Sequence, residues 1–154
     1  DIKVINTDKG VFYAFSILIA TGAHPRMIGF PGEEEYKGKG IAYCATCDGN
    51  FYKGKTIAVI SDNKESEEEV DFLAELAEKV YFCPSYKTDY SRENVIRLPG
   101  FVKSVNGERH ADGIMLSDGS IIAVDGVFFL KQTVSADVLL DGLEMNNGSV
   151  AALV

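Results

Sequence analysis

The clearest pattern of hydrophobic and polar positions lies between residues 65 and 79. Apolar side chains recur there at i, i+3, i+4 and i+7, namely at Val70, Leu73, Ala74 and Ala77. This spacing forms one stripe and predicts an amphipathic α-helix over 65–79. Asp62 and Glu65 have the spacing of a capping box, so we expect the helix to start near them. Lys79 would then lie in the last turn, where a cation suits the helix dipole.

Short apolar runs on either side of this helix, at 55–60 and 80–83, predict two buried strands. Strand, helix and strand in this order form a βαβ unit, whose two strands are parallel. Three further apolar runs follow, at 100–105, 113–117 and 120–124. They are separated by polar turns, including Asp118-Gly119, and predict an antiparallel meander. Residues 126–130 predict a strand that returns to the parallel sheet.

The N-terminal part of the chain has a different pattern. Residues 2–6 and 11–20 flank a turn-like segment and predict an antiparallel hairpin, whereas the Gly- and Pro-containing residues 21–40 predict a connector. A short helix is expected within 44–52. The whole pattern predicts an α/β fold: a Rossmann-like three-layer domain with a parallel sheet, one helix layer and an antiparallel three-stranded meander.

Charge and composition exclude several classes of function. The chain has 154 residues and a net charge of -8, without the Lys and Arg clusters that nucleic-acid binding needs. Its apolar stretches, such as 14–20, are too short to span a bilayer, and no secretory signal pattern is present. Three cysteines, two of them in a C-x-x-C motif, suit a reducing compartment. We therefore expect a cytoplasmic protein with no nucleic-acid or membrane partner.

The C-x-x-C motif, Cys44 to Cys47, is the strongest candidate for chemistry. Two thiols so spaced at a helix start can form a disulfide, and the helix N-terminus lowers the pKa of the first thiol, Cys44. Asp48 follows directly and is placed to exchange a proton with a leaving thiolate. Two alternatives remain at this point: half of a zinc site, and a structural pair of buried thiols.

A zinc site would need further ligands, and the remaining candidates are scattered: Cys83, His24 and His110. We therefore expect no metal site. Cys83 falls at the end of a predicted strand, which indicates a small buried hydrophobic side chain.

Four motifs over residues 17–60 occur in an order typical of one enzyme family. They are Ala20-Thr21-Gly22-Ala23, Pro31-Gly32-Glu33-Glu34, Gly38-Lys39-Gly40 and Cys44-Ala45-Thr46-Cys47-Asp48-Gly49. In this respect the sequence closely resembles the low-molecular-weight, flavin-containing thioredoxin reductases, which use NADPH. The combination is far more specific than C-x-x-C alone.

The resemblance implies a role for each site residue. Cys44 would attack or release the disulfide of thioredoxin, and Cys47 would face the flavin and take its electrons. Asp48 would be the general acid that protonates a departing thiolate. Thr21 and Gly22 would lie near FAD.

The resemblance also implies a division of the chain. Residues 27–131 would form a redox domain like the NAD(P)H domain of the family, inserted into an FAD domain. Residues 1–26 and 132–154 would be flanks derived from that FAD domain. FAD is then expected in the full-length parent, which would be a homodimer. We expect the 154-residue chain alone to bind no FAD and to be inactive.

The turn at which NADPH would be expected to bind is altered in this sequence. The strand at 56–60 runs into Ser-Asp-Asn-Lys-Glu-Ser, and no glycine occurs between Gly54 and Gly100. Glycines normally let the backbone approach a pyrophosphate at this turn. Five acidic residues also crowd the following helix start: Glu65, Glu67, Glu68, Glu69 and Asp71. The alternative explanation for these acids is a well-capped helix start on a solvated face.

Two further features of the family are missing. Paired arginines are replaced by Lys87 alone, and a Gly-His-x-Pro element is replaced by residues 131–134. The chain therefore resembles the branch of the family that takes electrons from ferredoxin, and we predict that NADPH does not bind. Two alternatives are an NADPH-dependent reductase with an atypical cofactor loop and a non-catalytic redox-sensing module.

Overall fold

The computed structural model describes residues 2–17, 29–131, 145–146 and 149–150. Strands β1 (Lys3–Thr7) and β2 (Gly10–Ala14) form an antiparallel hairpin in which the Thr7 hydroxyl donates to the carbonyl of Gly10 at 3.0 Å. This confirms the N-terminal hairpin. A second short antiparallel pair is formed by β11 (Met145–Asn146) and β12 (Ser149–Val150).

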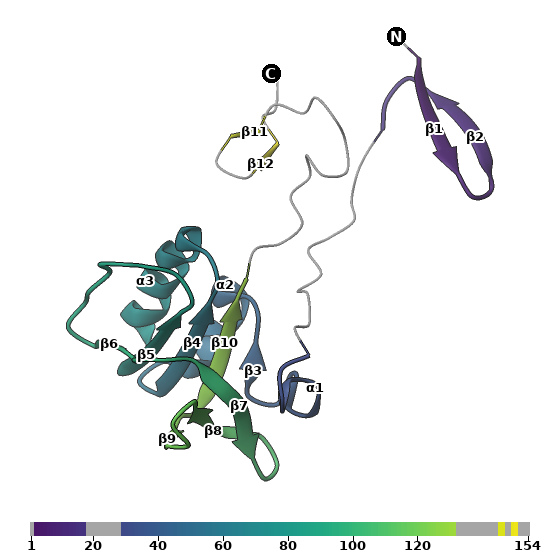
Figure 1. Ribbon diagram of the computed structural model, residues 1–154. Helices are drawn as coiled ribbons and strands as arrows, with labels where there is room; N and C mark the ends of the chain where they lie inside the picture. Colours follow the sequence, from purple (N-terminus) through teal and green to yellow (C-terminus); the bar gives the residue numbers. More distant parts are fainter. Residues whose placement is uncertain (1, 18–28, 132–144, 147–148, 151–154) are drawn as a thin grey trace.

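The core of the fold is a five-stranded parallel sheet in the order β3-β10-β4-β5-β6 (Figure 1). Its strands are β3 (Ile41–Ala42), β4 (Thr56–Ser61), β5 (Lys79–Pro84), β6 (Val95–Arg97) and β10 (Gly126–Leu130). The predicted βαβ unit and the returning strand are both confirmed. All five residues of β10 are buried because this strand lies between two others and is covered on both faces.

The helices follow the dithiol motif and strand β4. Helix α2 (Ala45–Asp48) continues into a 3₁₀ turn, η1 (Gly49–Tyr52), and helix α3 (Glu67–Leu76) is preceded by the 3₁₀ turn η2 (Lys64–Ser66). None of the helices that the structure describes is long and apolar enough to cross a membrane.

The predicted bounds of the long helix were wrong at both ends. The side chain of Asn63, not Asp62, caps the first turn by accepting from the Ser66 N–H at 2.9 Å. At the other end the helix stops at Leu76, and Lys79 begins β5 instead of closing the last helical turn.

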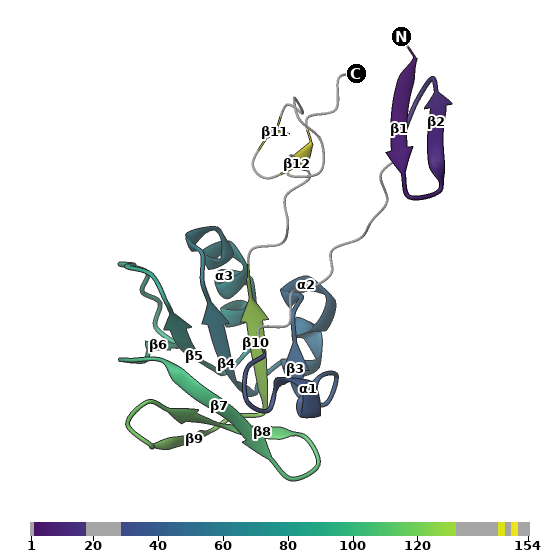
Figure 2. The ribbon, with the colours of Figure 1, turned by 45° about the vertical axis from the view of Figure 1, so that its right-hand side comes forward.

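The antiparallel meander consists of β7 (Val102–Gly107), β8 (Ala111–Leu116) and β9 (Ile121–Ala123) (Figure 2). Alternate residues of the central strands face different layers. Ile57 and Val59 pack with α3, whereas Ala58 packs with the meander. The helices and the meander therefore cover opposite faces of the sheet, and the predicted three-layer Rossmann-like domain is confirmed.

One helix lies where the sequence predicted only a connector. Helix α1 (Glu33–Tyr36) follows Gly32, whose φ of 90° suits glycine. A Cβ atom at this position would lie 2.2 Å from the carbonyl oxygen of Val105, so glycine is also required by the close approach of β7.

Candidate active site: the Cys44–Cys47 disulfide

Cys44 and Cys47 form a disulfide at the start of α2, with their Cα atoms 5.3 Å apart. Cys44 is the N-cap residue, and its backbone is extended. Its Sγ accepts a hydrogen bond from the Cys47 N–H at 3.2 Å. The helix start expected near Cys44 is thus confirmed. Sulfur at this position faces amide groups that have no partner within the helix, and such groups stabilise a thiolate.

The two cysteines are not equally exposed. Cys47 is exposed as a residue, whereas Cys44 is half-buried, and the Cys44 Sγ lies 3.5 Å from the Thr46 hydroxyl. Of the two residues, Cys47 therefore presents more surface to solvent. Among the described residues, no group of three or more His, Cys, Asp and Glu side chains is arranged to hold a metal ion.

Asp48 is the last residue of α2 and is half-buried. Burial, helped by the charges of Asp48 and Asp125, raises the pKa of the Tyr52 hydroxyl in η1. The Tyr52 ring packs edge-on against Phe128 with 5.2 Å between ring centroids. Asp48 thus follows the disulfide directly, at the point where α2 continues into η1.

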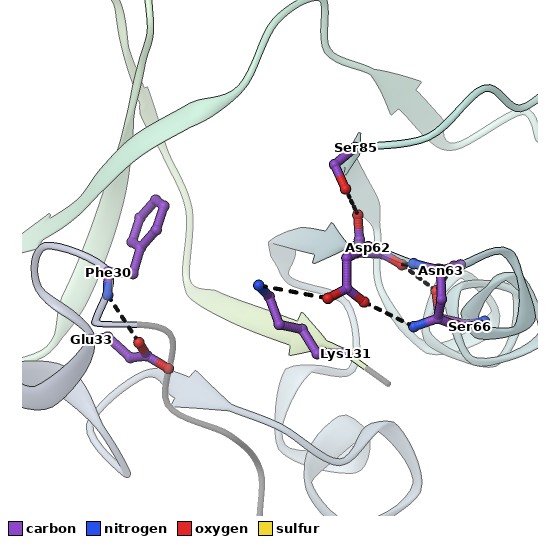
Figure 3. Close-up of polar contacts among 8 residues, drawn as sticks. Phe30, Glu33, Asp62, Asn63, Ser66, Ser85 and Lys131 are labelled. Carbon is purple, nitrogen blue, oxygen red and sulfur yellow. Dashed lines mark hydrogen bonds and ion pairs between the residues drawn. The ribbon is translucent and has the colours of Figure 1, made fainter. Parts of the chain in front are cut away.

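Tyr43, the residue before the dithiol, is fixed by a buried carboxylate. Its hydroxyl donates to Glu33 Oε1 at 3.0 Å. The Phe30 N–H donates to the other oxygen, Glu33 Oε2, at 3.1 Å (Figure 3). Glu33 is completely buried. Burial, together with the Glu33 carboxylate, raises the pKa of Tyr43 well above its ordinary value. Sequence reasoning used Glu33 only as part of a motif and missed this anchor.

Helix α3 packs directly on the segment that carries the dithiol. A Cβ atom on Gly49 would lie 3.1 Å from Leu73 Cδ2 and 3.2 Å from Leu76 Cδ1. Leu73 is completely buried and shares a core cluster with Ala45. Glycine at 49 therefore allows η1 and α3 to approach closely, which fixes α2 against the helix layer.

The turn after β4 is filled by its own side chains. The Ser66 hydroxyl donates to the carbonyl of Asn63 at 2.8 Å and is also hydrogen-bonded to the Ser61 hydroxyl. The Ser61 hydroxyl also lies 3.0 Å from the Asn63 carbonyl. The Asn63 side chain occupies the Ser66 N–H at the helix start, and the hydroxyl groups of Ser61 and Ser66 lie beside it. A bound phosphate would otherwise contact this N–H.

An ion pair lies beside this turn. Lys131, the residue after β10, places its Nζ 3.7 Å from Asp62 Oδ2 (Figure 3). Both residues line a cavity of about 300 Å³ at the carboxyl ends of β4, β5 and β10, together with Cys83 and Phe30. Ligands of open α/β sheets bind at this edge. Cys83 is 4% exposed, which confirms it as a small buried side chain in β5.

The acidic residues of α3 have more partners than the sequence suggested. Asp71 accepts from Arg92 at 2.9 Å and from the Tyr90 hydroxyl at 2.7 Å, and these bonds lower its pKa. Glu67 accepts from the Thr88 hydroxyl at 2.6 Å. Arg92 therefore offsets part of the negative charge that these acids give to the helix.

Thr21 and Gly22, the two predicted FAD contacts, lie outside the described residues. The structure brings Cys44, Cys47 and Asp48 together on α2. Sequence reasoning missed Tyr43 and its buried partner Glu33. The position of the tyrosine directly before the dithiol was the signal available.

Comparison with known proteins connects this geometry to one family. The chain is 35% identical to the thioredoxin reductase of Aquifex aeolicus, over 95% of its own length and 51% of that protein. It is 31% identical to the thioredoxin reductase of Treponema pallidum, over 93% of its length and 52% of that protein. No family model matches the chain.

Solved structures give the same result. A ferredoxin-flavin thioredoxin reductase from Clostridium acetobutylicum is 33% identical and superposes with a TM-score of 0.66, covering 99% of this chain and 53% of that one. The thioredoxin reductase of Streptococcus pyogenes has a TM-score of 0.75 at 25% identity, covering 97% and 55%. The chain spans about half the length of these relatives, and over that half it is similar to thioredoxin reductases in sequence and in fold.

Proposed function

We propose that the chain is the dithiol-bearing part of a flavin-dependent thioredoxin reductase. The observation that carries this proposal is the Cys44–Cys47 disulfide at the start of α2, in a chain similar to thioredoxin reductases along nearly its whole length. In the proposed reaction, the Cys44–Cys47 disulfide accepts two electrons and two protons and becomes a dithiol; FAD, when bound in the full-length reductase, would supply the electrons. The dithiol then reduces thioredoxin by exchange through a mixed disulfide.

The exchange assigns a role to each site residue. One thiolate attacks the thioredoxin disulfide and forms a mixed disulfide, and the second thiolate attacks that bond and restores Cys44–Cys47. Asp48 supplies the proton that a leaving thiolate takes. We keep the assignment of Cys44 to thioredoxin and Cys47 to flavin as a prediction. The greater exposure of Cys47 favours the opposite order, so trapping the mixed disulfide with Cys44→Ser and Cys47→Ser distinguishes the two.

The flanks complete the proposal. Residues 1–26 and 132–154 belong to an FAD domain in the full-length reductase, with Thr21 and Gly22 near the flavin. FAD is then a cofactor of that reductase, which is a cytoplasmic homodimer acting on a thioredoxin-like protein. Residues 27–131 form the inserted redox domain, and the compact body described over 29–131 supports this division.

We further propose that ferredoxin, and not NADPH, supplies the electrons. Three observations support this. The turn at 61–66 is filled by Ser61, Asn63 and Ser66, and the Asn63 side chain accepts from the Ser66 amide. At the same edge the Lys131 ammonium is already paired with the Asp62 carboxylate, which makes this cation less available to a pyrophosphate. A solved relative with 33% identity is named a ferredoxin-flavin thioredoxin reductase.

The test uses the full-length reductase that carries this chain. Its flavin absorbance is followed under anaerobic conditions after addition of reduced ferredoxin or of NADPH, and thioredoxin reduction is measured with each donor. We expect rapid bleaching and turnover with ferredoxin alone. Bleaching within seconds at micromolar NADPH would favour the NADPH-dependent alternative with an atypical cofactor loop.

A third outcome separates the enzyme from a redox sensor. If the flavin is reduced by either donor but thioredoxin is not, the dithiol is a sensor and the proposed activity is wrong. The double variant Cys44→Ser/Cys47→Ser is the matched control, because its flavin should still be reduced while thioredoxin reduction is lost.

A further inference from the structure

Thr46 lies between the two cysteines, and its hydroxyl faces the sulfur of Cys44. The distance from Thr46 Oγ1 to Cys44 Sγ is 3.5 Å. A disulfide sulfur carries no hydrogen, so the threonine hydroxyl is the donor in this contact. Thiol exchange needs two sulfurs and a source of protons, and it does not by itself require a hydroxyl at this place. The contact therefore gives Cys44 something that a C-x-x-C motif alone does not supply.

Two hydrogen-bond donors converge on the sulfur of Cys44. One is the Thr46 hydroxyl, and the other is the Cys47 N–H, which lies 3.2 Å from Cys44 Sγ. In the part of the chain that the structure describes, no hydrogen bond to the Cys47 sulfur is found. A hydrogen bond to the charged form of a group favours that form. These contacts therefore favour negative charge on Cys44 over negative charge on Cys47.

The segment that carries both donors is held by contacts other than the disulfide. Ala45, between Cys44 and Thr46, is completely buried. The Asp48 N–H donates to the carbonyl of Cys44 at 3.1 Å and closes the turn that contains Thr46. Reduction breaks the S–S bond and leaves these backbone and packing contacts in place. We therefore expect the Thr46 hydroxyl to remain beside the Cys44 sulfur in the reduced chain.

Charged side chains around the dithiol do not provide this stabilisation. Helices α2 and α3 and the turn η1 contain no lysine or arginine, and their charged residues are all acidic: Asp48, Glu67, Glu68, Glu69, Asp71 and Glu75. A carboxylate near a thiolate disfavours the charged form of the sulfur. The neutral hydroxyl and amide are therefore the groups that favour a thiolate at Cys44.

The cations on the neighbouring segments are directed toward aromatic rings. Lys55 Nζ, after η1, lies 5.4 Å from the centroid of the Tyr52 ring. Lys37 Nζ lies 5.9 Å from the centroid of the Tyr43 ring, just before the dithiol. Burial raises the pKa values of both tyrosines, so these hydroxyl groups are neutral at pH 7.

We propose that Thr46 is a catalytic residue of the dithiol, whose hydroxyl donates to the Cys44 sulfur and makes Cys44, and not Cys47, the thiolate of the reduced pair. The proposal rests on the dithiol function proposed above and adds a residue to it. In the exchange, the Cys44 thiol gives up its proton and its sulfur attacks one sulfur of the disulfide partner. The partner's S–S bond breaks, and the departing sulfur takes up a proton.

The second half of the exchange restores the enzyme disulfide. The Cys47 thiol loses its proton and attacks Cys44 Sγ, and the second partner sulfur leaves and is protonated in turn. Two electrons and two protons have then passed from the dithiol to the partner. Thr46 acts in the first half, where the Cys44 thiolate forms.

The first test identifies the more reactive cysteine in wild type. The 154-residue chain is reduced and treated at pH 7 with less than one equivalent of iodoacetamide, and tandem mass spectrometry locates the label. Cys44 should carry at least about threefold more label than Cys47, although Cys47 is the more exposed residue. Burial raises the pKa of Cys83 to about 12, so Cys83 should stay unlabelled. Label chiefly on Cys47 overturns the proposal.

The second test removes the hydroxyl. Thr46→Val keeps the branched shape of the side chain and loses the donor, whereas Thr46→Ser keeps the donor. The alkylation rate is measured between pH 5 and pH 10. The midpoint of Thr46→Val should rise by about 0.5–1 pH unit. Its rate at pH 7 should fall about two- to threefold, because a thiolate of higher pKa is rarer but more nucleophilic.

Two further variants separate the hydroxyl from a general effect of substitution. Thr46→Ser should stay within about 0.3 pH unit of wild type. Thr56→Val removes a threonine hydroxyl from the first residue of β4, where the backbone N–H donates to Asp125 at 2.9 Å, and its profile should match wild type. A Thr46→Val profile that coincides with wild type overturns the proposal. So does a shift of equal size in Thr46→Ser or in Thr56→Val.

The wild-type labelling covers the case in which a variant does not fold. Neither experiment needs flavin, ferredoxin or thioredoxin, so the Thr46 proposal and the proposed electron route can fail separately. Label on Cys44 in a chain whose full-length reductase does not reduce thioredoxin would leave the Thr46 proposal standing and overturn the proposed function alone.

Discussion

Two helix starts near the same sheet have opposite chemical characters. At α2 the N-cap is Cys44, and the disulfide leaves Cys47 exposed to solvent. At the turn before α3 the cap is Asn63, and hydroxyl groups of Ser61 and Ser66 fill the space beside it. Both ends supply backbone N–H groups. The comparison shows that capping side chains decide whether such an end serves for chemistry or only for stability.

The largest effect is expected at the first of these two helix starts. Cys44→Ser or Cys47→Ser should lower thioredoxin reduction by the full-length reductase by about 10³-fold or more, because no disulfide can form. Cys83→Ala removes the third cysteine and should leave turnover close to wild type, since Cys83 is buried in β5. Turnover is measured with thioredoxin and reduced ferredoxin. Residual activity above about one tenth in a serine variant would contradict the dithiol assignment.

The next effect tests the proton donor. Asp48→Asn keeps the size of the side chain and removes its acid function, so turnover should fall about 10²-fold with the disulfide intact. The same substitution at the other helix start, Asp62→Asn, should change turnover less than about twofold, because Asp62 pairs with Lys131 and not with the dithiol. Equal rates for Asp48→Asn and wild type would favour the redox-sensor alternative.

A smaller effect concerns the anchor before the dithiol. Tyr43→Phe removes a hydroxyl that donates to the buried Glu33 carboxylate. The free energy of unfolding should fall by about 1.5–3 kcal/mol, as for other hydrogen bonds to charged groups. Urea denaturation of the 154-residue chain measures this change. Tyr13→Phe, at a position that is 72% exposed, is the matched control and should stay within about 0.5 kcal/mol of wild type.

The smallest effect is expected at the ion pair beside the second helix start. Lys131→Ala removes the cation 3.7 Å from Asp62, and both side chains are partly solvated. The loss of stability should be less than about 1 kcal/mol and should shrink further at high salt. Urea denaturation at low and high ionic strength checks this. A loss well above that limit would mean that the pair stabilises the turn as strongly as the buried Glu33 anchor stabilises the dithiol end.

The parts of the fold that the sequence predicted are those with strong local patterns. The stripe of Val70, Leu73 and Ala74 and the apolar run of β10 determine a helix and a buried strand from neighbouring residues alone. Strands β3 and β6 have two and three residues, which is too short for any periodicity, and they form because β10 and β5 pair with them. Pairing with a neighbouring strand, and not the local sequence, therefore determines β3 and β6.

The candidate site divides in the same way. Cys44, Cys47 and Asp48 lie within five consecutive residues, so the sequence alone predicts that they occur together on α2. The contact of Glu33 with Tyr43 joins residues 10 positions apart, and it depends on packing that no short motif records. The choice of Asn63 over Asp62 as the cap depended on a one-residue difference in where the turn ends.

The cavity at the carboxyl edge of the sheet has one more consequence. Phe30 and Lys131 stand near the two ends of the body described over 29–131, and both border this cavity. The polypeptide therefore enters and leaves that body at nearly the same point. A domain whose two ends leave from nearly the same point can rotate as a rigid body about that point. The same closeness would let a short linker join the two ends into a self-contained circular permutant.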